Sequence, residues 1–79
     1  MRILDVDTDK KIDNVMLLLT KSELKQLIGY ANQLLEKPSA DHHHLSSNDY
    51  QNEIIVCFYD PSNLANFNPR IQKLVSENE

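Results

Sequence analysis

The chain has 79 residues, of which 41% are apolar and 25% charged, and a formal net charge of −4. This length suits one domain, so we expect residues 1–79 to fold as a single domain, and the composition is too apolar for a disordered tail. The pI near 5.2 argues against a partner nucleic acid, because binding to phosphates depends on clustered Lys and Arg.

Membrane and secreted classes are also disfavoured. The longest uninterrupted apolar run, Val15 to Leu19, is much shorter than the roughly 20 residues of a membrane span. The N-terminal residues Met1 to Asp5 lack the apolar core of a signal peptide. Cys57 is the single cysteine, which excludes an internal disulfide and fits a reducing compartment. We therefore expect a cytoplasmic protein without a membrane partner or a cofactor.

The first part of the chain has the pattern of a β-hairpin. Arg2–Val6 is a predicted strand, the polar run Asp7–Lys11 a predicted turn, and Ile12–Leu19 the predicted return strand. Because the return run is rich in leucine, its pattern is ambiguous between helix and strand. Its shortness, and the helix start that follows it at once, favour a strand.

A helix start follows at Thr20-Lys21-Ser22-Glu23, which has the spacing of a capping box. Apolar residues then recur at helical spacing on one face: Leu24, Leu27, Ile28, Ala31, Leu34 and Leu35. Gly29 interrupts this helix, which indicates close approach either of a partner backbone or of the protein's own sheet. Pro38 places the helix end near Lys37.

The second half alternates polar and apolar segments. Ser39–Asn52 is a predicted loop, in which an edge strand over His42–Ser46 is left open, and Glu53–Tyr59 is a predicted strand. Asn68 and Pro69 predict the start of a short helix that extends to about Ser76. The sequence therefore predicts an α+β fold, with a small, mainly antiparallel sheet in β-β-α-β-α order and the helices on one face.

The second and third predicted strands are apolar on both faces, which is unusual for a sheet that helices cover on one side only. A bare apolar face of this size is typical of an interaction surface. We therefore expect a homodimer; the alternative is a monomer whose second helix covers the opposite face. The side chains predicted at the dimer interface are Met16, Leu18, Ile55, Cys57 and Tyr59.

The segment Asp41-His42-His43-His44 is the most distinctive motif. Imidazole is a common metal ligand, but the spaced patterns of zinc sites are absent, so we expect no metal site. On an extended chain His42 and His44 share one face and His43 lies on the other. We expect Asp41, the three histidines and Tyr50 to bind a ligand or a partner. No arrangement of nucleophile and base indicates catalysis, so we assign no catalytic residue and expect a protein that is not an enzyme.

The sequence resembles the small acidic immunity proteins that neutralise bacterial polymorphic toxins. The resemblance covers about half the chain, and consists of the β-β-α-β layout, the leucine-rich helix Leu24–Leu35, and the segment Asp41–Leu45 before Ile54-Ile55-Val56. It implies tight stoichiometric inhibition of a toxin through an acidic surface, without catalysis.

We therefore expect a non-enzymatic homodimeric binding protein, an inhibitor or immunity-type factor that engages a basic partner protein. The alternative is a bacterial or phage protein that sequesters a small anionic ligand, such as a nucleotide, through His42–His44. A metal-dependent enzyme that uses these histidines is the least favoured interpretation.

Overall fold

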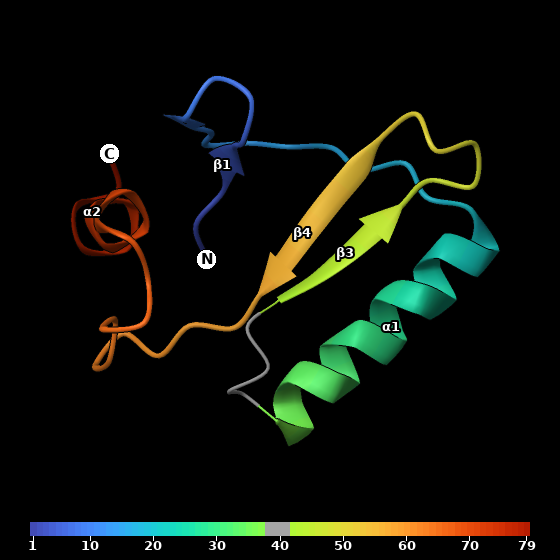
Figure 1. Ribbon diagram of the computed structural model, residues 1–79. Helices are drawn as coiled ribbons and strands as arrows, with labels where there is room; N and C mark the ends of the chain where they lie inside the picture. Colours follow the sequence, from blue (N-terminus) through green and yellow to red (C-terminus); the bar gives the residue numbers. More distant parts are fainter. Residues whose placement is uncertain (38–41) are drawn as a thin grey trace. The chain divides into compact units, whose positions relative to one another are not determined.

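The computed structural model describes residues 1–37 and 42–79. Figure 1 shows their helices and strands, and the strands form two separate antiparallel sheets, β1–β2 and β3–β4. The chain divides into two compact units, one of Leu18–Tyr59 and one of Met1–Leu17 with Asp60–Glu79. In chain order the elements are β1 (Leu4–Asp5), β2 (Lys10–Lys11), α1 (Lys21–Glu36), β3 (His42–Ser46), β4 (Glu53–Cys57) and α2 (Pro69–Glu77).

The capping box predicted at the start of α1 is confirmed. The Thr20 hydroxyl accepts a hydrogen bond from the Glu23 amide at 3.2 Å, and the Glu23 carboxylate accepts one from the Thr20 amide at 2.7 Å. These two bonds satisfy amides that the first turn of a helix leaves without a partner. They fix residue 21 as the first residue of α1.

The Glu23 carboxylate also holds the turn between β3 and β4. Its second oxygen accepts a hydrogen bond from the Asn48 amide at 2.7 Å, and the Asn48 side-chain amide donates to the Thr20 hydroxyl at 3.0 Å. Glu23 is accordingly buried, with 7% of its surface exposed. The hydrogen bonds from the Thr20 amide and then the Asn48 amide hold the pKa of this carboxyl below its ordinary value.

The β3–β4 hairpin packs one face on α1. Its register places His43 opposite Val56 and Leu45 opposite Ile54, and these four side chains are buried or half-buried. The core of this unit contains Leu45 and, from α1, Leu34. An isolated two-stranded sheet is marginally stable in water, so packing against α1 is what makes the hairpin stable.

The other compact unit consists of Met1–Leu17 and Asp60–Glu79, so it combines segments that are far apart in the sequence. Asn68 caps the start of α2 as predicted, because its side chain accepts a hydrogen bond from the Ile71 amide at 2.9 Å. At the other end of α2, the Arg2 guanidinium donates to the carbonyls of Leu74 and Val75. Leu74 is the buried side chain of α2.

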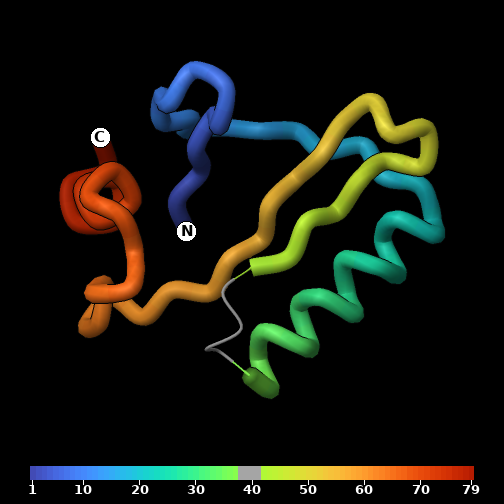
Figure 2. Tube along the Cα trace, in the orientation of Figure 1, coloured from blue at the N-terminus to red at the C-terminus, as the bar shows by residue number. Residues whose placement is uncertain are grey.

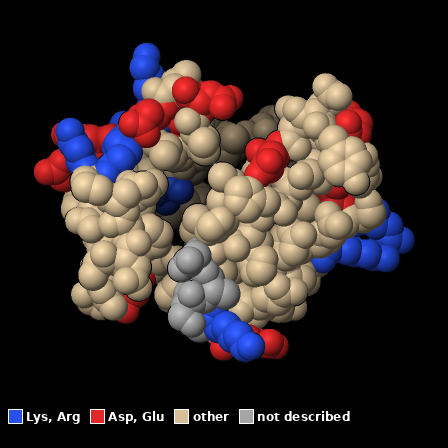
Figure 3. Space-filling view, in the orientation of Figure 1, with Lys and Arg blue, Asp and Glu red and all other residues tan. Residues whose placement is uncertain are grey.

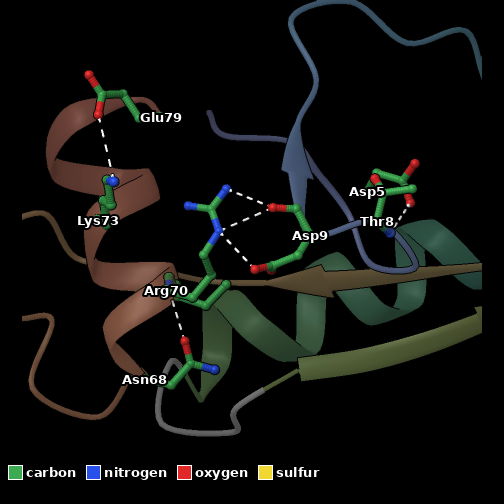
Figure 4. Close-up of polar contacts among 8 residues, drawn as sticks. Asp5, Thr8, Asp9, Asn68, Arg70, Lys73 and Glu79 are labelled. Carbon is green, nitrogen blue, oxygen red and sulfur yellow. Dashed lines mark hydrogen bonds and ion pairs between the residues drawn. The ribbon is translucent and has the colours of Figure 1, made fainter.

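Arg70 connects α2 to the turn between β1 and β2. Figure 4 shows its guanidinium reaching Asp9, where it donates two hydrogen bonds to the backbone carbonyl and pairs with the carboxylate at 3.3 Å. Asp9 has a left-handed backbone with φ of 61°, a conformation that aspartate tolerates in turns.

The α+β class, the antiparallel pairing and the order of elements agree with the prediction, and the edge strand left open over His42–Ser46 is present as β3. The extents predicted for the first two strands are wrong. Leu4 pairs with Lys11 and Asp5 with Lys10, so the hairpin turns two residues earlier than predicted. Residues 12–20, which include the whole of the predicted return strand, have no regular secondary structure, and Figure 2 traces them as an irregular segment before α1.

Within the described residues, a Cβ atom added at Gly29 would meet no atom within 4 Å apart from the backbone of its own helix. Close packing on the protein's own sheet therefore does not account for this glycine. No helix in the described part of the chain is long and apolar enough to cross a membrane.

We predict that Glu23→Gln destabilises the chain at neutral pH, because the amide group cannot accept hydrogen bonds at both positions. A carboxyl with a lowered pKa contributes stability that is present above the ordinary glutamate pKa of about 4.3 and is lost as the pH falls through the lower folded value. Urea midpoints measured between about pH 7 and pH 3 should therefore fall for the parent chain and change less for the variant. Glu36→Gln, at the exposed end of the same helix, is the control and should leave the midpoint unchanged.

Candidate functional site

The face of β3–β4 opposite α1 is open to solvent in the described structure. Strand alternation brings His42 and His44 of β3 together there with Glu53, Ile55 and Cys57 of β4. All five are exposed, and the register places Cys57 opposite His42 and Ile55 opposite His44. We call these five residues the open face. The predicted sharing of one face by His42 and His44 is confirmed.

Two imidazoles and a carboxylate on the open face contact one another. The ring centres of His42 and His44 lie 4.8 Å apart with the planes at 66°. The Nδ1 atom of His44 contacts a carboxylate oxygen of Glu53. Both side chains are about half exposed, at 50% and 47%, so this contact is accessible to solvent.

His43 belongs to the opposite face and not to this group. Its ring stacks on Tyr30 of α1, with ring centres 4.7 Å apart and planes that are parallel within 1°. Its Nε2 atom is buried and has no hydrogen-bond partner within residues 1–37 and 42–79. The three histidines predicted to act together are therefore divided, two on the open face and one against the helix.

Tyr50 lies at the turn of the β3–β4 hairpin, and 85% of its surface is exposed. Its backbone has φ of 59°, which is a genuine outlier for a bulky residue. The turn is held by the Tyr50 amide donating to the Ser47 carbonyl, and by the Ser47 hydroxyl donating to Asp49. The hydroxyl of Ser47 and then the amide of Gln51 lower the pKa of Asp49, the residue that precedes Tyr50 in the chain.

The residues predicted at a dimer interface occupy different places. Met16 and Leu18 belong to the irregular segment before α1 and are 81% and 89% exposed. Ile55 and Cys57 lie on the open face, whereas Tyr59 follows β4 and is half-buried. Asp41, predicted to act with the histidines, lies outside the described residues.

Sequence reasoning missed two partners of the histidines, Tyr30 for His43 and Glu53 for His44. The signal that locates Glu53 is the register of the hairpin. Once Leu45 is opposite Ile54, the alternation places Glu53 on the same face as His44. The stack on Tyr30 has no comparable signal, because it joins a strand to a helix.

The described residues contain no group of three or more His, Cys, Asp or Glu side chains placed to hold a metal ion. Comparisons with protein-family models, with curated proteins and with solved structures find no match. The function is therefore inferred from the chain's own surface chemistry.

We predict that Tyr50→Asn stabilises the chain relative to Tyr50→Ala. Both variants remove the exposed ring, but only asparagine adopts the left-handed backbone at low cost. The expected difference in free energy of unfolding is about 0.5–1 kcal/mol, measured by urea denaturation. Equal stability of the two variants would show that the backbone at position 50 stores no strain.

Proposed function

We propose that this chain is a non-enzymatic binding protein that acts as a homodimer and engages a basic partner protein. The observation that carries the proposal is the imbalance between buried and exposed apolar side chains. In the described residues, the buried apolar side chains are those of Leu34, Leu45 and Leu74. Many more large ones are exposed, among them Val15, Met16, Leu17, Leu18, Leu24, Ile28, Leu35, Tyr50 and Ile55.

The segment before α1 is the strongest support for self-association. Val15, Met16, Leu17 and Leu18 are consecutive, and their exposed fractions are 54%, 81%, 48% and 89%. Such a run costs free energy in water, at roughly 25 cal/mol per Å² of apolar surface. Domains of this size commonly gain stability by forming oligomers, and a second copy supplies a matching apolar surface without another gene product.

Charge supports the choice of a basic partner. The net charge of −4 favours encounter with a positively charged protein, because opposite potentials raise the association rate. Uncharged side chains cover broad areas of the face drawn in Figure 3, where acidic groups are also exposed. This combination suits the stoichiometric inhibition that the resemblance to immunity proteins implies.

The alternative, a small anionic ligand held by the histidine segment, receives less support. His43 faces α1, so at most two of the three imidazoles would contact one ligand on the open face. Glu53, which contacts His44, would repel an anion there.

We predict that light scattering gives the chain a mass of about twice 9.1 kDa at micromolar concentration, and that Leu18→Asp reduces it to that of one chain. Leu18 is 89% exposed, so the substitution should not disturb a monomer, whereas an interface would bury the new charge without a partner. Leu35→Asp is the control, because Leu35 is also exposed but lies outside the predicted interface. A parent mass near one chain would refute the homodimer.

We also predict that the chain copurifies in fixed stoichiometry with a basic protein encoded by an adjacent gene, and that coexpression abolishes that protein's toxicity. The association rate should fall steeply as salt is raised, because long-range attraction between the charges is screened. Toxicity that persists in the presence of an excess of the chain would contradict the inhibitor function and leave the dimer test unaffected.

A further inference from the structure

The outer edge of β4, which faces away from β3, offers backbone groups for pairing. The Ser47 amide donates to the Asn52 carbonyl at 2.8 Å, and this pair continues the β3–β4 register toward the turn. Bonded and non-bonded pairs alternate along an antiparallel ladder. Ile54 and Val56 are therefore bonded to β3, whereas the amide and the carbonyl of Ile55 point outward.

Neither a further strand nor a protective feature is found at this edge. In the described ranges, 1–37 and 42–79, β4 pairs with no strand other than β3, and no other backbone hydrogen bond of Ile55 is found there. β4 contains no Lys or Pro and its register has no bulge, although these features commonly protect the edges of sheets. Its central residues Ile54-Ile55-Val56 are all β-branched, and a two-stranded sheet is marginally stable without further strands or packing. Such an edge is suited to the addition of another strand.

We propose that the β4 strands of two copies pair antiparallel about a twofold axis at Ile55, which gives one four-stranded sheet in the order β3–β4–β4–β3. This inference rests on the homodimer proposed above and names the surface through which it forms. At the axis, Ile55 lies opposite Ile55 of the second copy, and the two outward amides donate to the two outward carbonyls. Glu53 of each copy lies opposite Cys57 of the other.

Charge favours a second copy over the basic partner at this edge. The three central residues of β4 are uncharged, and Glu53 is its only charged residue. In the twofold register the two Glu53 residues lie on opposite sides of the axis, roughly 13 Å apart along the strands, which exceeds the Debye length of about 8 Å. Each Glu53 carboxylate keeps its contact with His44 of its own copy. The pairing therefore brings no like charges together.

The first test removes the outward amide of Ile55. Ile55→Pro deletes one donor of the pairing, and proline is tolerated at an edge position whose amide does not bond to the neighbouring strand. Light scattering at micromolar concentration should give the parent about twice 9.1 kDa and the variant the mass of one chain. Ser46→Pro is the matched control, because the same alternation directs the Ser46 amide to the outer edge of β3, and it should keep the mass of two chains. Circular dichroism checks that both variants are folded.

The second test depends on Ile55 lying opposite its own counterpart. Ile55→Lys and Ile55→Glu each place like charges directly opposite one another. Because Ile55 is 41% exposed, neither substitution should unfold a single chain. Sedimentation should show each variant alone with a dissociation constant about tenfold or more above that of the parent. An equimolar mixture of the two should recover pairs, because a lysine then faces a glutamate.

Two results would overturn the proposal. The first is a parent dimer that Ile55→Pro leaves intact, which would place the interface elsewhere and leave the homodimer standing. The second is a mixture that is as dissociated as its two components, which excludes this register. If Ser46→Pro dissociates as well, recovery in the mixture still supports the register and its absence overturns it. A parent mass of one chain is a different failure, because it refutes the homodimer and with it the pairing of its strands.

Discussion

The Glu23 carboxylate is the interaction on which the arrangement of α1 and the β3–β4 hairpin depends. It accepts one hydrogen bond from the helix cap at Thr20 and one from the hairpin turn at Asn48. One side chain therefore fixes both the first turn of the helix and the place where the hairpin meets it. With the turn held at one end, strand alternation decides which side chains face α1 and which face solvent.

That alternation gives the three consecutive histidines different surroundings. His43 enters the interface with the helix and stacks on Tyr30, whereas His42 and His44 remain on the open face with Glu53. A motif that looks uniform in the sequence is thus one structural side chain between two exposed ones.

Local signals made the helices and β4 predictable. The capping box at Thr20, the N-cap Asn68 before Pro69 and the β-branched run at Ile54 to Val56 each specify their element within a few residues. The strand predicted over Ile12–Leu19 was wrong because a strand also needs a partner for its backbone groups, and the pairing with β1 ends at Lys11. The partners of His43 and His44 depend on register and on helix packing, which composition does not specify.

Arg2 donates to the carbonyls of Leu74 and Val75 across more than 70 residues of chain. The last turn of α2 is therefore completed by Arg2, whereas the hydrogen bonds that the Glu23 carboxylate accepts from Thr20 and Asn48 span 3 and 25 residues. During synthesis on the ribosome, the α1–β3–β4 unit has all its residues while the C-terminal helix is still untranslated. The contacts of Arg2 form only after translation has passed Val75, so a chain truncated before α2 lacks them.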